Sequence, residues 1–232
     1  MKKQKRKKGP GKKEKKGKPQ TEINIIEAAL RVFGEHGFEA TTISAICKAA
    51  NISDATLYEY FDSKEEVLFS IPEIYTRREL ERMQEISRYV HSPREKIRVI
   101  IQGYLEFYEK NRMYTSVALL TLKGNRNFLN TPAYGVVREA SRSIVEAFEE
   151  GVKAGEFRDD TDGYLVRNMV LGFIEHLTIQ WLVVGRPESI SGYRDIIFDM
   201  VMKAIEKTKN EDWLEVRVKG IPPLVNPRRD GG

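Results

Sequence analysis

The fold of the N-terminal region is decided by residues 42–61, TISAICKAANISDATLYEYF. A threonine oxygen accepts hydrogen bonds from the free amides at a helix start, so Thr42 can cap a short helix. Asn51 tolerates the left-handed backbone of a tight turn better than most residues do. Ser53 can cap the helix that follows, which we predict to end at Phe61. The stretch therefore predicts two short helices joined by a tight turn.

The side chains of the second of these helices divide into an inner and an outer set. Leu57 and Phe61 point inward, and nearby alanines allow neighbouring helices to approach closely. The polar side chains left for the outer face are Ser53, Thr56, Tyr58 and Tyr60. A helix of this kind after a short turn fits the major groove of DNA, which is about 12 Å wide. We therefore predict a helix-turn-helix, with its recognition helix between Ser53 and Phe61.

Helical periodicity extends from this motif in both directions. From Thr21 apolar residues recur three or four positions apart, and Gly34 and Gly37 close a first helix. After the motif, Ser63 and Glu66 have the spacing of a capping box. Further helices are predicted near residues 63–90, 93–110, 112–123, 132–154, 162–184 and 191–209. No strand-like alternation of any length occurs, so the predicted fold class is all-α, with about nine helices.

The basic residues are concentrated at the N-terminus. Residues 1–19 contain ten Lys, one Arg and one Glu, a net charge of +10 against +5 for the whole chain. Residues 20–232 therefore sum to −5. A polar, glycine-containing arm of this kind cannot offset the entropy of ordering, and its charge favours nucleic acid through counterion release. A solubilising tail is the alternative, and acidic lipid ranks below nucleic acid because no membrane-seeking helix adjoins the arm.

The chain lacks the residue patterns of several other classes of protein. Cys47 is the only cysteine, and neither a signal peptide nor an apolar run long enough to span a bilayer is found. His36, His91 and His176 are scattered, and no catalytic triad, phosphate-binding glycine loop or metal-ligand cluster occurs. We expect a cytoplasmic protein that is not an enzyme, binds no membrane and uses no metal or cofactor.

Residues 22–70 resemble the TetR family of bacterial regulators. The similarity rests on many positions that agree in order and spacing, among them Ala28-Ala29-Leu30, Gly37-Phe38, Thr41-Thr42-Ile43, Ala49-Ala50-Asn51-Ile52-Ser53, Thr56-Leu57-Tyr58-Glu59-Tyr60-Phe61 and Ser63-Lys64-Glu65. The resemblance implies a three-helix DNA-binding domain at 20–66 and a ligand-binding and dimerisation domain at 67–209. These lie between the disordered arm at 1–19 and a flexible tail at 210–232.

The resemblance also implies how the protein works and which residues touch DNA. The implied protein is a repressor that binds a palindromic operator on double-stranded DNA as a homodimer and is released by a small-molecule effector. Six positions match places where the family contacts DNA, mostly through phosphates: Thr42, Ser53, Thr56, Tyr58, Tyr60 and Lys64. For Tyr60 the alternative is a ring packed under the motif.

Four residues in or just before the recognition helix bear on DNA binding, and two of them depart from the family. Asn51 and Ala55 stand where glycine is usual, and Ala55 adds a methyl group where the backbone approaches DNA. Asp54 and Glu59 place carboxylates near phosphates, which costs Coulomb energy unless they accept from cytosine or pair with a cation. For Asp54 the alternative is a stabilising charge at the helix N-terminus.

The C-terminal half contains aromatic and polar residues at helical spacing. The candidates for lining a ligand pocket are Tyr104, Tyr108, Phe173, His176, Gln180 and Trp181. Ordinary core packing is the alternative. The apolar bias indicates a hydrophobic ligand, a fatty acyl or an aromatic compound. The last two helices are the predicted dimer interface, with one exposed stripe of Ile196, Ile197, Met200, Val201 and Ile205.

A second class of function remains open at this point. A helical protein-binding or RNA-binding module could use the basic arm without any response to a ligand. It would leave the arrangement of residues 53–64 unexplained.

Overall fold

The computed structural model describes residues 19–207, so the predicted basic arm, apart from Pro19, and the whole of the predicted tail lie outside the described residues. This part of the chain folds into nine α-helices and contains no strand beyond an isolated bridge between Phe157 and Glu206. The all-α prediction is confirmed. No helix within residues 19–207 is both long and apolar enough to cross a membrane.

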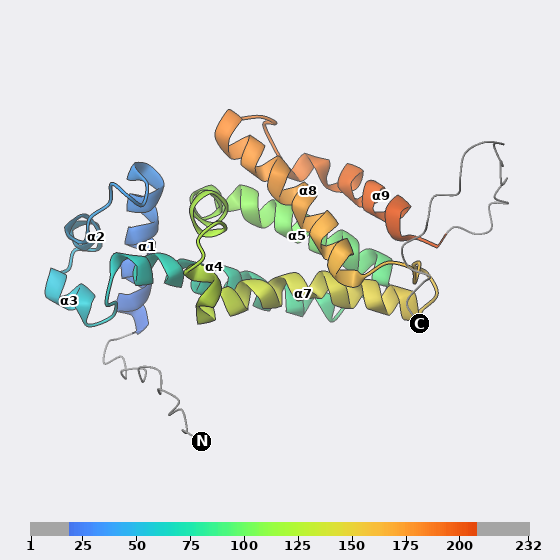
Figure 1. The fold of residues 1–232 in the computed structure, drawn as a ribbon, viewed down its shortest axis with the longest axis horizontal. Coiled ribbons are helices and arrows are strands. Elements are labelled where there is room, and N and C mark those ends of the chain that lie inside the picture. The colour runs from blue at the N-terminus through green and yellow to red at the C-terminus, as the bar shows by residue number, and fades with distance from the viewer. Residues whose placement is uncertain (1–18, 208–232) are drawn as a thin grey trace, which may run out of the picture.

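The first three helices gather at one end of the elongated molecule (Figure 1). They are α1 (Pro19–His36), α2 (Ile43–Ala50) and α3 (Asp54–Tyr58). The predicted caps are confirmed: the Thr42 oxygen accepts from the amide of Ala45, and the Ser53 oxygen accepts from the amide of Thr56. Asn51 has the predicted left-handed backbone, with φ 56° and ψ 47°. These contacts fix the turn between α2 and α3.

The recognition helix is shorter than predicted, because α3 ends at Tyr58 and not at Phe61. The amides of Tyr60 and Phe61 both donate to the Leu57 carbonyl, at 2.9 and 3.0 Å. The rings of Tyr60 and Phe61 are buried in the core. The chain therefore leaves the helix so that both rings can enter the core.

Helix α4 (Lys64–Ser87) connects helices α1 to α3 with the rest of the molecule (Figure 1). The Ser63 oxygen accepts from the Glu66 amide at 3.1 Å, while the Glu66 carboxylate accepts from the amide of Asp62 at 2.6 Å. The second half of the capping box therefore lies one residue earlier than its pattern predicts. Inside α4, the Ser70 hydroxyl donates to the Glu66 carbonyl, and Pro72 follows two residues later.

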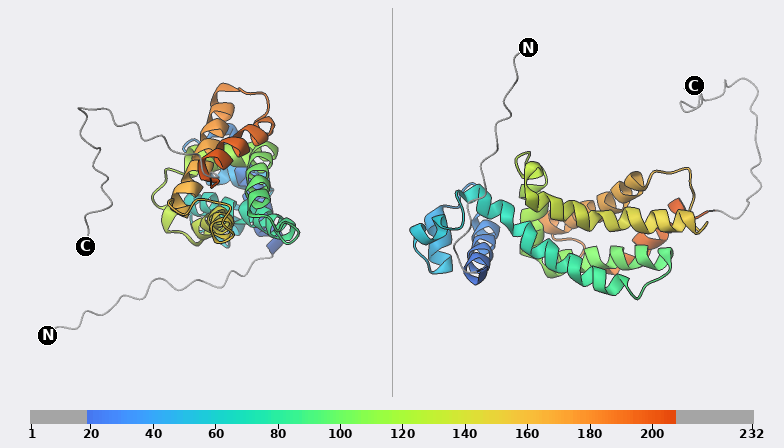
Figure 2. Two further views of the ribbon diagram at one scale, coloured as in Figure 1. Left: turned by 90° about the vertical axis from the view of Figure 1, so that its right-hand side faces the viewer. Right: turned by 90° about the horizontal axis from the view of Figure 1, so that it is seen from below.

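The remaining helices form a bundle. They are α5 (Pro93–Lys110), α6 (Arg112–Ser116), α7 (Pro132–Lys153), α8 (Gly163–Val184) and α9 (Arg194–Ile205), with short 3-10 turns at Phe128–Asn130 (η2) and Ser191–Tyr193 (η3). Helices α4 and α7 pack together along the long axis, α8 packs on both α7 and α5, and α9 packs on α5 (Figures 1 and 2).

The predicted single helix at 112–123 is wrong, because α6 passes into a π-helical segment, η1 (Val117–Leu122). A π-helix bonds each amide to the carbonyl five residues earlier, so it has a wider turn than an α-helix. Val117 and Leu122 are five residues apart and both enter the core around the N-terminal helices, whereas Leu119 enters the core of the bundle. The wider turn lets one short segment serve both cores.

The two cores meet around α6 and η1. The first contains apolar residues of α5, α7, α8 and α9, and the second unites α1 to α4 with Tyr114, Val117, Leu122, Phe128 and Ala133. The DNA-binding helices therefore do not pack as an isolated unit. They share buried apolar surface, the main favourable term in folding, with the segment that follows α5.

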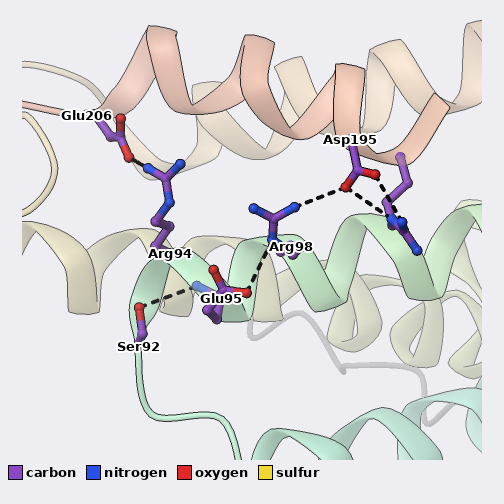
Figure 3. A network of polar contacts seen from close by, with 7 residues as sticks. Ser92, Arg94, Glu95, Arg98, Asp195 and Glu206 are labelled. Carbon is purple, nitrogen blue, oxygen red and sulfur yellow. Dashed lines mark hydrogen bonds and ion pairs between the residues drawn. The ribbon is translucent and has the colours of Figure 1, made fainter.

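Helix α9 is held on α5 by charged side chains (Figure 3). Arg94 pairs with Glu206, and Arg98 Nη1 lies 3.0 Å from Asp195 Oδ1. The Arg98 guanidinium also lies 3.7 Å from the ring centroid of Phe198, a favourable cation–π distance. This contact fixes which face of α9 is turned toward the bundle.

The predicted exposed stripe on α9 is therefore only partly right. Ile196 and Met200 are half exposed, at 56% and 50%. Ile197, Val201 and Ile205 are buried against the bundle. At about 100° per residue, the five positions spread over about half of the helix circumference, so only the edge with Ile196 and Met200 is left outside.

Candidate DNA-binding face and ligand cavity

Helix α3 presents a small polar surface at the end of the molecule. Ser53, Asp54, Ala55 and Glu59 are exposed, and the Tyr58 ring is 54% exposed. Thr42 is exposed at the start of α2, and Thr56 is half-buried. The structure thus brings most of the predicted DNA-contacting residues together on one surface.

Asp54 links α3 to α2. The Ser44 hydroxyl donates to Asp54 Oδ2 at 3.1 Å. Burial, together with a hydrogen bond and the negative charge of Asp54, raises the pKa of the Cys47 thiol to about 11. The thiol is therefore protonated at neutral pH. Asp54 holds the two helices of the motif in place, a role that the sequence alone does not reveal.

Lys64 forms hydrogen bonds within the protein. Its ammonium donates to the carbonyls of Phe38 and Thr41, each at 2.7 Å, and to that of Glu39 at 3.4 Å. It also lies 4.4 Å from the ring centroid of Phe38. A lysine ammonium has three donors, so these three carbonyls can occupy them all. In this conformation Lys64 holds the loop after α1 against the start of α4, and its phosphate contact stays a prediction.

Tyr60 lies in the core and not on the exposed surface. Only 7% of it is accessible, and it packs with Phe61 beneath the motif. This placement matches the alternative interpretation from the sequence, a ring packed under the helix-turn-helix. Its predicted DNA contact stays a prediction.

A cavity of about 440 Å³ opens between α4, α5 and α7. This volume lies within the range of roughly 300–1,000 Å³ that is typical of small-molecule sites. Its wall is largely apolar and aromatic and includes Met83, Ile100, Tyr104, Phe107, Tyr108, Tyr114 and Val137. Two predicted ligand residues, Tyr104 and Tyr108, are among them.

The other four predicted ligand residues lie on α8 and do not line this cavity. Phe173, His176 and Gln180 are exposed on the outer surface of α8. Trp181 is buried, and the Arg112 guanidinium lies 4.4 Å from its ring centroid. Helical spacing predicted that these residues lie near one another on α8. It did not predict which side of α8 packs against the other helices.

Two cavity residues that sequence reasoning missed are Thr76 and Tyr114. Both are buried, and their hydroxyl oxygens lie 2.9 Å apart. Tyr114 also stacks on Tyr75 at a centroid distance of 4.9 Å and belongs to the core of the N-terminal helices. Thr76 is followed by Arg77, Arg78 and Glu79, so nothing in the local sequence marks it as a cavity residue.

Met113, the residue before Tyr114, contacts α1 directly. A Cβ atom added to Gly34 would lie 2.5 Å from Cγ of Met113, so the methionine fits where only a glycine leaves room. Segment 113–114 therefore contacts both the cavity and the first helix of the DNA-binding region.

The chain matches two family descriptions that together span most of the described residues. Residues 25–71 match "Bacterial regulatory proteins, tetR family", and residues 77–204 match "YsiA-like protein, C-terminal region". The chain belongs to the TetR family of bacterial regulatory proteins. The predicted family is confirmed, and the TetR fold places the helix-turn-helix at its N-terminus.

Individual TetR relatives align with this chain over most of their length. The fatty acid metabolism regulator protein of Bacillus subtilis is 24% identical over 183 residues, which cover 79% of this chain and 94% of that protein. The solved FadR structure from Bacillus halodurans covers 81% of this chain and 97% of its own, with 24% identity and a TM-score of 0.74. FadR from Bacillus subtilis in complex with stearoyl-CoA covers 78% and 97%, with 23% identity and a TM-score of 0.73.

Membership of the TetR family gives the protein its general function. It is a DNA-binding transcriptional regulator that acts as a homodimer and responds to a small ligand. The similar proteins are regulators of transcription, and none of the comparisons supports a helical protein-binding or RNA-binding module instead.

Proposed function

We propose that the protein is a repressor that occupies a palindromic operator as a homodimer and leaves it when a fatty acyl ligand fills the cavity. The observation that carries this proposal is the position of Tyr114. Its side chain lines the cavity and is also part of the core that holds the DNA-binding helices.

A ligand releases DNA only if it binds more tightly to a conformation that binds the operator less tightly. The cavity lies against α4, which continues directly into the helix-turn-helix. A ligand that displaces Thr76 or Tyr114 therefore acts on the element that positions α3. The two recognition helices of a dimer then lose the spacing that two operator half-sites require.

The fatty acyl class is proposed for the ligand on two grounds. The cavity exposes more apolar than polar surface, as expected for a site that holds a hydrophobic chain. A similar Bacillus subtilis protein is named as a fatty acid metabolism regulator, and one similar structure contains stearoyl-CoA. Aromatic acids are the second class to test.

The outer surface of α8 and α9 is the proposed dimer interface. Leu165, Met169 and Phe173 recur four residues apart on α8 and are 61%, 37% and 42% exposed. On α9 they are joined by Ile196 and Met200. A surface of this kind on two adjacent helices is suited to a four-helix contact across a two-fold axis.

We further propose that the lysine-rich residues 1–19 supply a sequence-independent share of the affinity for DNA. The exposed residues of α3 include two carboxylates, Asp54 and Glu59, so the recognition helix itself contributes no positive charge. Operator binding should be compared at several salt concentrations for the full chain and for a chain that begins at Gln20. An unchanged slope against salt would reject this role for the arm.

The experiment that tests the proposed function starts from DNA. Genomic fragments retained by the purified full-length protein would be sequenced, and a palindrome common to them would be confirmed by DNase protection. Release of that fragment would then be measured with dodecanoyl-CoA, dodecanoic acid and aromatic acids. Release by dodecanoyl-CoA is expected, and release by none of these compounds would overturn the proposal.

A further inference from the structure

Two tyrosine hydroxyls in the cavity have no hydrogen-bond partner in the part of the chain that the structure describes. Tyr104 and Tyr108 are one helical turn apart on α5, with ring centroids 5.9 Å apart. Neither hydroxyl has a hydrogen-bond partner among residues 19–207, although Tyr108 is only 8% exposed. No fully buried side-chain oxygen in this part of the chain lacks a partner, so both hydroxyls must face open space, and both side chains line the cavity.

These hydroxyls are hydrogen-bond donors at neutral pH. Burial raises the pKa of Tyr104 and Tyr108 above the ordinary tyrosine value, and the positive charge of Arg167 offsets this only in part for Tyr104. Burial likewise raises the pKa of Tyr114 to about 12. Tyr114 has Thr76 as its partner, so it is not available in the same way.

The surroundings favour a neutral acceptor over a charged one. The two cations that line the cavity are already paired, Lys96 with Glu150 and Arg142 with Glu146 at 3.0 Å, and Arg167, whose charge acts on Tyr104, is not among the lining residues. Two further carboxylates, Glu79 and Glu139, also belong to the wall. A carboxylate moved from water into an apolar cavity without a cation carries a large desolvation cost, whereas a carbonyl oxygen needs only a donor.

We infer that Tyr104 and Tyr108 bind a neutral carbonyl oxygen of the ligand, that of a ketone, ester or thioester, while the apolar wall holds its hydrocarbon chain. This inference rests on the proposed function, because it names the chemical group that the same cavity selects. A free carboxylic acid is the ligand that it excludes.

Three compounds with the same undecyl chain and a carbonyl carbon at its end test the inference. They are methyl undecyl ketone, dodecanoyl-CoA and dodecanoic acid. Calorimetric titration of the full-length dimer with each compound would be carried out on the wild type, on the Tyr104→Phe/Tyr108→Phe variant and on Tyr89→Phe. Tyr89 is 77% exposed and lies outside the cavity, so it is the matched control.

The wild type should bind the ketone at least tenfold more tightly than the acid. Loss of two hydrogen bonds should weaken binding of the ketone and of the thioester by about 5- to 100-fold in the double variant, with no change in Tyr89→Phe. Circular dichroism and operator binding in the absence of ligand show whether the double variant is folded. If it is not, the single Phe variants replace it, each with a smaller expected loss.

Tightest binding of the acid would overturn the inference, and so would unchanged affinity for the ketone in a folded double variant. Operator release separates the inference from the proposed function. If the ketone binds in a way that depends on both tyrosines but does not release the operator, the proposed release is wrong and the inference stands. If dodecanoyl-CoA binds the wild type and the double variant equally well and releases the operator from both, the inference is wrong and the proposed function stands.

Discussion

Replacing Tyr114 by Phe removes one oxygen atom from the boundary between the cavity and the DNA-binding helices. The hydroxyl oxygens of Tyr114 and Thr76 lie 2.9 Å apart, and Thr76 is 8% exposed. Tyr114→Phe leaves a buried threonine hydroxyl without its partner, which costs about 1–3 kcal/mol of folding free energy. Thr76→Val leaves the Tyr114 hydroxyl unpaired, and we expect a loss of similar size.

The double variant Thr76→Val/Tyr114→Phe decides whether the two groups act as a pair. Replacement of both partners by apolar groups of the same shape is close to neutral, so the double variant should lose less stability than either single variant does. Urea unfolding followed by circular dichroism measures all four proteins at one fixed concentration, because the stability of a dimer depends on concentration.

The operator provides the second measurement for the same variants. If this hydroxyl pair connects the cavity to α4, the ratio of operator affinities with and without ligand should fall toward one in the double variant. Losses of stability that simply add, or an unchanged ratio of affinities, would refute the reasoning. Tyr89→Phe is expected to change neither quantity, because Tyr89 is largely exposed.

Three further predictions concern other parts of the fold. Lys64→Met should destabilise the protein by about 1.5–3 kcal/mol in urea unfolding, since three carbonyls lose a charged donor; weaker operator binding at unchanged stability would instead show a direct DNA contact. Hydrogen bonds from Ser191, Ser189 and nearby backbone amides hold the pKa of Glu109 below its ordinary value, although its burial opposes this. The ionised carboxylate therefore stabilises the fold above the unfolded pKa, and this contribution is lost as pH falls through the folded pKa. Glu109→Gln should lower the Tm at neutral pH and flatten its decline in acid, and parallel curves for both proteins would contradict this. Phe173→Glu should give a monomer by light scattering and weaken operator binding; an intact dimer would rule out this face of α8 as the interface.

Local signals predicted the N-terminal region well because each of them acts within a few residues. The caps Thr42 and Ser53 and the left-handed turn at Asn51 depend on neighbouring amides and on backbone sterics, so the residue types suffice. The end of α3 was predicted less well. Its length depends on where the Tyr60 and Phe61 rings find space in a core built by distant segments.

The cavity was only half predictable for the same reason. Tyr104 and Tyr108 on α5 line it, but the contributions of α4 and α7 depend on how three helices pack, which spacing along one helix does not determine. Helical periodicity shows which residues of α8 share a face. It does not show that Phe173, His176 and Gln180 lie on the outside and away from the cavity.

The interruption in α4 has a consequence for the geometry of the dimer. Pro72 has no N–H to donate to the Leu68 carbonyl, and the Ser70 hydroxyl bonds to the Glu66 carbonyl, so the helical ladder is weakest one turn before Thr76. Helices bend most readily where the ladder is interrupted. We therefore expect a ligand that displaces α4 at the cavity to bend this helix at residues 68–72 and to move α3. A dimer contains two copies of α4, so the bends in both copies add up in the distance between the two recognition helices.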